Sequence, residues 1–75
     1  MDESDELPAN VRRAIILDEM SGVGQMIYRL TVRAKVRRAI GDTKTAETVA
    51  RELETLERVL DEYRKELAKI EEAKS

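Results

Sequence analysis

The second half of the chain carries an unbroken heptad pattern of apolar residues. Its members recur at alternating spacings of three and four residues: Ala46, Val49, Leu53, Leu56, Leu60, Tyr63, Leu67 and Ile70. This spacing places all of these side chains along one narrow stripe of one long helix. Since a helix cannot bury such a stripe against itself, the pattern predicts a helix that packs against another helix.

A matching pattern lies in the first half of the chain. Apolar residues follow the same alternation at Ile16, Met20, Val23, Ile27, Leu30 and Ala34, and these residues are named the inner seam. The inner seam passes Gly22 and Gly24, and each glycine inside a helix costs about 1 kcal/mol relative to alanine. The periodicity favours one continuous or merely kinked helix, and a break near residues 21–24 is the alternative.

Gly-Asp-Thr at residues 41–43 separates the two patterns. Glycine suits the left-handed residue that ends a helix, and Asp42 or Thr43 can accept the free N–H groups that open the next helix. At the other end, Pro8 fits a first helical turn because its missing N–H is not needed there. The sequence therefore predicts a first helix over about 8–40, a turn over 41–43 and a second helix over about 44–73.

Two helices of equal length joined by a short turn predict an all-α, antiparallel helical hairpin with coiled-coil-like packing. The chain of 75 residues has room for one domain, which we expect over residues 8–75. Residues 1–7 are acidic and nearly devoid of apolar side chains, so we expect them to form a disordered tail. Because no segment resembles a signal peptide or a membrane span, we expect an intracellular, cytoplasmic protein.

The first helix carries more apolar surface than one neighbouring helix can cover. Beside the inner seam it has a second apolar set and a third one: Val11, Ile15, Met26, Val36 and Ile40, then Leu17, Tyr28 and Val32 near the small residues Ala14, Ser21 and Gly24. A helix that is apolar on all sides is usually an interior one. We therefore expect a homo-oligomer, most simply a dimer that forms a four-helix bundle, with a partner protein of different sequence as the alternative.

The first helix also carries a row of arginines: Arg29, Arg33 and Arg37 recur every four residues, with Arg12 roughly in line. Guanidinium groups in a row can follow phosphates, so this basic face supports an alternative function as a nucleic-acid-associated regulator. The net charge of −2 and the presence of only two aromatic residues argue against that function. The simpler interpretation is that the arginines pair with acids of the second helix, such as Glu52, Glu57 and Glu66, or with acids of another subunit.

The chain offers no constellation that is typical of catalysis or of cofactor binding. It contains neither Cys nor His, and adjacent carboxylates such as Asp18 and Glu19 point about 100° apart on a helix. The Gly-x-Gly of residues 22–24 has no strand before it and no Lys-Ser/Thr after it, so close helix packing explains it better than a phosphate loop does. We expect no catalytic, cofactor-binding or metal-binding residues, and no enzyme.

These patterns predict a small non-enzymatic interaction or assembly module that homo-oligomerises, or binds a partner protein, through its helices. The residues expected at the interface are Ile15, Met26, Tyr28, Val32, Val36, Arg29, Arg33 and Arg37. We expect no membrane among its partners, and nucleic acid is the less favoured one.

Overall fold

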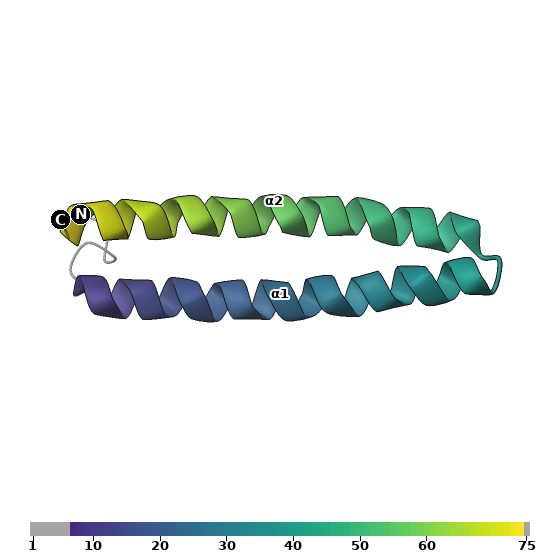
Figure 1. Cartoon of the computed structure of the whole chain (residues 1–75), viewed down its shortest axis with the longest axis horizontal. Coiled ribbons are helices and arrows are strands. Elements are labelled where there is room, and N and C mark those ends of the chain that lie inside the picture. Colours follow the sequence, from purple (N-terminus) through teal and green to yellow (C-terminus); the bar gives the residue numbers. More distant parts are fainter. Residues whose placement is uncertain (1–6, 75) are drawn as a thin grey trace.

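The computed structural model describes residues 7–74, and it shows an antiparallel hairpin of two helices (Figure 1). Helix α1 spans Ala9–Ala39 and helix α2 spans Thr43–Lys74. The start of α1 and the end of α2 lie at one end of the hairpin, and the turn lies at the other. The predicted all-α hairpin is confirmed for this part of the chain. The predicted acidic tail, residues 1–7, lies outside the described residues apart from Leu7.

The two helices meet along the inner seam of α1 and the heptad stripe of α2. Every residue of both sets is buried or half-buried. The centre of the core consists of Leu30, Ala34 and Val49, and Leu53 and Leu56 pack against it. Among the described residues, no large side chain is completely buried. A hairpin of two helices therefore has a thin core, because each helix covers only one face of the other.

Helix α1 continues without a break past Gly22 and Gly24, so the prediction of a continuous helix is confirmed and the alternative of a break is wrong. Val23, between the two glycines, is half-buried in the inner seam. Packing of the inner seam against α2 outweighs the low helix propensity of the glycines, because tertiary contacts supply most of the stability of a helix in a protein.

The turn depends on one glycine with a left-handed backbone. Gly41 has a φ of +82°. Its N–H donates to the carbonyl oxygen of Arg38 at 3.1 Å, and the N–H of Asp42 donates to the carbonyl oxygen of Arg37 at 2.8 Å. Together these bonds form a Schellman motif, which satisfies the last carbonyl groups of α1. The predicted role of Gly41 is confirmed.

Asp42 connects the two helices through its side chain. Its Oδ1 accepts the N–H of Thr45 at 3.2 Å, which caps the first turn of α2. Hydrogen bonds from the hydroxyl and the N–H of Thr45 hold the pKa of the Asp42 carboxyl below its ordinary value, and the positive charge of Arg37 adds to this effect. Arg37 Nη1 lies 3.6 Å from Asp42 Oδ2, so this ion pair ties the end of α1 to the start of α2.

The helix boundaries differ by one residue from the predicted ones. Pro8 precedes α1 instead of occupying its first turn: its ψ of 150° is extended, and its carbonyl oxygen accepts the N–H groups of Val11 and Arg12. Helix α2 begins at Thr43 because the residue before it, Asp42, supplies the cap. Side-chain patterns locate a helix well, whereas its last residues depend on backbone hydrogen bonds that the pattern does not contain.

The left-handed backbone of the turn gives a prediction with a matched control. Replacing Gly41 by alanine should lower the free energy of unfolding by about 1–2 kcal/mol, because a Cβ is strained at positive φ. Replacing Gly24 by alanine should raise it by about 0.5–1 kcal/mol, because the helix gains propensity and the new Cβ meets no atom within 4 Å. Denaturant unfolding followed by circular dichroism measures both changes. If both alanine variants change the free energy of unfolding by the same amount in the same direction, the left-handed conformation assigned to Gly41 is contradicted.

Candidate interaction surface

The exposed apolar side chains of the hairpin are concentrated on α1. Among the described residues, ten large apolar residues are exposed, and Val59 is the only one of them in α2. The others are Leu7, Val11, Ile15, Leu17, Met26, Tyr28, Val32, Val36 and Ile40. The predicted excess of apolar surface on the first helix is therefore present in the folded hairpin. An exposed apolar surface of this kind is typical of an interaction site.

Part of this surface belongs to a second heptad pattern, which runs along α1 to its C-cap residue Ile40 and is named the outer stripe. Its members recur at alternating spacings of four and three residues, and all are exposed: Ile15, Glu19, Gly22, Met26, Arg29, Arg33, Val36 and Ile40. Met26 exposes 47% of its surface and Val36 exposes 53%. The spacing is that of a helix which packs along another helix. Helix α2 covers the inner seam and leaves the outer stripe exposed.

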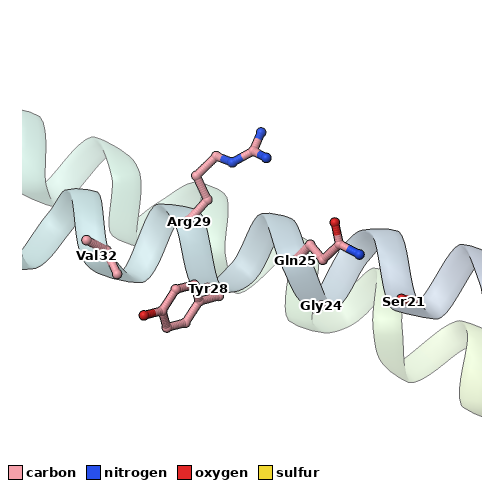
Figure 2. A pocket seen from close by; sticks show the side chains of 6 residues that line it. All are labelled: Ser21, Gly24, Gln25, Tyr28, Arg29 and Val32. Atoms are coloured by element: carbon pink, nitrogen blue, oxygen red, sulfur yellow. The ribbon is translucent and has the colours of Figure 1, made fainter.

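A shallow groove of about 780 Å³ lies along α1 beside the outer stripe. It is lined by Ser21, Gly24, Gln25, Tyr28, Arg29 and Val32. Figure 2 shows Tyr28 and Arg29 projecting from different sides of α1, with α2 behind the helix. Tyr28 exposes 73% of its surface, the largest fraction among the exposed large apolar residues. The third apolar set of α1 therefore lies at the surface of the hairpin and not in its core.

A second groove, of about 450 Å³, lies at the N-terminal half of the outer stripe and is named the acidic groove. It is lined by Asp18, Glu19, Gly22, Val23, Met26 and Leu56, so both helices contribute to it. Neither Asp18 nor Glu19 forms an ion pair within residues 7–74. The groove thus combines two carboxylates that lack a neutralising partner with apolar walls, and it can receive a cationic side chain.

The arginines of α1 differ in their surroundings. Arg29 and Arg33 are exposed, and in the part of the chain that the structure describes neither forms an ion pair. Arg37 pairs with Asp42 at the turn. Arg12 does not belong to this row: it is half-buried, and its Nε is buried without a hydrogen-bond partner. Its predicted alignment is wrong because Arg12 precedes Ile16 by one helical turn and so faces α2.

The predicted pairing of these arginines with acids of α2 is also wrong for the described residues. Glu66 pairs instead with Lys69, at 3.0 Å, on its own helix. Across the hairpin, Arg13 Nε donates to Glu71 Oε1 at 2.6 Å. Arg29 and Arg33 project away from the inner seam, so acids on α2 do not reach them. Their charges remain available to another molecule.

The outer face of α2 is occupied by ion pairs within that helix. Lys65 Nζ donates to Glu62 Oε1 at 3.0 Å and lies 3.9 Å from Asp61 Oδ2. The hydrogen bond to Glu62, together with the negative charges of both acids, raises the pKa of Lys65 above its ordinary value. This face of α2, away from its heptad stripe, is exposed and charged, as is typical of the solvent-facing side of a helix.

The Gly-x-Gly of residues 22–24 lies in the interior of α1, where the backbone N–H groups belong to the helix, so it forms no phosphate loop. Within the described range, no group of three or more potential ligands is placed to hold a metal ion. No described helix is long and apolar enough to cross a membrane.

Glu19 and Gly22 were not expected at the interface, because the predicted interface combined apolar residues of the first helix with its row of arginines and did not extend the heptad spacing through these two positions. The signal that finds them is the spacing, which continues from Ile15 to Ile40 through polar positions. No protein-family model matches this chain, and neither a curated protein nor a solved structure is significantly similar to it.

Proposed function

We propose that this chain is a small non-enzymatic interaction and assembly module that associates with another helical surface through α1. The observation that carries this proposal is the unequal distribution of exposed apolar side chains, nearly all of which lie outside α2. Covering this surface removes apolar area from water, which is the main favourable contribution to most protein association. Self-association into a four-helix bundle is the simplest form of such an assembly.

The thin core of the hairpin supports the same proposal. Leu30, Ala34 and Val49 form a small buried centre, and the chain has no cysteine for a disulfide bond. Small domains without disulfide bonds or metals usually gain their stability from exceptionally good packing or from oligomerisation. Association through the outer stripe adds a second buried face to α1.

Co-purification of two tagged copies tests self-association. The chain is co-expressed with two different affinity tags, and purification through the first tag should retain the second. As a control, the two tagged chains are expressed in separate cultures and the lysates are then mixed. This control shows how much of the second tag is retained through contacts that form only after lysis. Retention of the first copy alone, together with a foreign protein in fixed proportion, would assign the surface to a partner protein instead.

A nucleic-acid-associated function is a second candidate, because Arg29 and Arg33 are exposed and lack ion pairs within the described residues. A row of such cations can contact phosphates. Two observations argue against this function. Asp18 and Glu19 lie on the same helix and repel phosphates. Tyr28 is the one strongly exposed aromatic side chain, and one such side chain is too few for base stacking. The apolar surface therefore supports the assembly function better.

Binding to duplex DNA separates the two candidates. At physiological salt and micromolar protein, we expect no detectable shift of a random duplex in a mobility assay, because non-specific binding requires several neutralised phosphates. The variant with Arg29→Glu and Arg33→Glu is the matched control. A shift in the parent chain that weakens steeply with added salt and disappears in this variant would reverse the order of the two candidates.

A further inference from the structure

The outer stripe of α1 divides into an acidic half and a basic half. Glu19 lies in the N-terminal half, beside Asp18 and the acidic groove. Arg29 and Arg33 lie in the C-terminal half. The charges are arranged about the middle of the stripe, since Glu19 and Arg33 are each seven residues from Met26. By helix rise, each charge lies about 10 Å from the level of Met26.

We infer that the outer stripe binds the outer stripe of a second copy of this chain, antiparallel, about a two-fold axis close to Met26. This inference rests on the proposed assembly function and specifies its partner and its orientation. A two-fold axis makes each contact occur twice, so Glu19 of each copy faces Arg33 of the other. The acidic groove of each copy then receives the basic half of the other copy.

The apolar residues of the outer stripe fit the same orientation. Ile15 lies eleven residues before Met26 and Val36 lies ten residues after it. In the antiparallel pair, Ile15 of one copy and Val36 of the other therefore lie at nearly the same level along the helices. Met26 lies against its own counterpart, and the neighbouring Gly22 has no side chain to hold the two helices apart there. Three levels thus match apolar with apolar residues or acid with base, and Arg29 lies near the level of Gly22 of the other copy, which has no side chain.

A parallel pair of α1 helices fails on charge. It places Arg29 and Arg33 against the same arginines of the second copy, and it places Glu19 against Glu19. Like charges across an interface are costly and act against the wrong partner or the wrong orientation. The hairpin provides no intrachain acid for Arg29 or Arg33 within the described residues. The antiparallel orientation places Glu19 opposite Arg33 and keeps Arg29 away from the Arg29 of the second copy.

Cysteine cross-linking tests the orientation, and the native chain has no cysteine to interfere. Met26→Cys should form a disulfide-linked dimer under mild oxidation, because the two copies of this residue meet near the two-fold axis. Val36→Cys alone should not, because by helix rise its two copies lie about 30 Å apart. A mixture of Ile15→Cys and Val36→Cys chains should form the mixed dimer. Arg58→Cys, exposed on α2, is the control for random collision.

A charge exchange tests the pairing of Glu19 with Arg33. Either Glu19→Arg or Arg33→Glu alone should weaken the dimer by about tenfold in dissociation constant, because each change converts two symmetry-related attractive pairs into repulsive ones. The variant with both changes should recover the dissociation constant of the parent chain. Sedimentation equilibrium measures all four proteins at the same ionic strength.

The outcomes separate this inference from the proposed function. Self-linked Val36→Cys dimers, or double-variant chains that dimerise no better than the single variants, would overturn the antiparallel orientation and leave self-association standing. If the parent chain sediments as a monomer and the Met26→Cys variant forms no cross-link, both the antiparallel orientation and self-association are overturned. Cross-linking at Met26→Cys and in the mixed pair, with none for Val36→Cys or Arg58→Cys, is the result that the inference predicts.

Discussion

Replacement of Val36 by aspartate is expected to separate the copies of this chain and to unfold it in the same step. Val36 is 53% exposed in the hairpin and lies outside the inner seam. If the hairpin were stable as a monomer, it would therefore tolerate aspartate at this position. In an assembly that buries the outer stripe, a carboxylate at this position has no partner and is strongly unfavourable. Circular dichroism and sedimentation at the same protein concentration should show loss of helix and of mass together.

Val59→Asp is the matched control for this experiment. It introduces the same residue at the only large apolar side chain that α2 exposes among the described residues. It lies about one helical turn from Glu62 and about two from Glu66, on a charged face, so we expect little change in mass or in helix content. If Val36→Asp and Val59→Asp behave alike, the outer stripe is not the interface.

Replacement of Leu30 by alanine is expected to lower the free energy of unfolding by about 2–5 kcal/mol, because it removes a large buried side chain and leaves a cavity. Leu30 is 6% exposed and lies in the buried centre with Ala34 and Val49. For a protein of this size, such a loss is a large part of the total stability. Urea unfolding at a fixed protein concentration measures the change.

Leu17→Ala is the control on the same helix. Leu17 is 37% exposed and belongs neither to the inner seam nor to the outer stripe, so the same substitution should cost about 1 kcal/mol or less. Equal shifts of the urea midpoint for the two variants would show that the inner seam does not define the contact between α1 and α2.

The contact between the helices could be predicted because it depends on local periodicity. The inner seam from Ile16 to Ala34 is buried or half-buried at each of its positions, although it passes two glycines. The turn could also be predicted, since a left-handed residue favours Gly41 and a helix start favours Asp42. These features are each specified by a few neighbouring residues.

The surroundings of the charged side chains were harder to predict. Arg12 was expected in line with the exposed arginines, but it lies half-buried at the end of the inner seam. Arg29 was expected to pair with an acid of α2 or of another subunit, and among the described residues it pairs with no acid of α2. Long charged side chains adopt whichever contacts the folded surroundings allow, so a one-dimensional pattern of charges does not determine their partners.

The residues of the candidate interface could be located from the sequence, but the molecule that covers them could not. Ile15, Met26 and Val36 were expected to remain uncovered by one hairpin, and each is exposed in the structure. The identity of the covering surface depends on contacts between molecules. The folded hairpin adds one indication of that surface, because it shows the acidic groove and the exposed arginines at opposite ends of one stripe.

Sedimentation equilibrium of the intact chain across a wide range of concentrations, combined with thermal unfolding of the same samples, tests the self-association of α1 most directly. We expect a folded species of twice the 8.6 kDa chain mass and a thermal midpoint that rises with protein concentration, because mass action favours the assembled state. A well-folded monomer of 8.6 kDa with a midpoint independent of concentration would contradict the account.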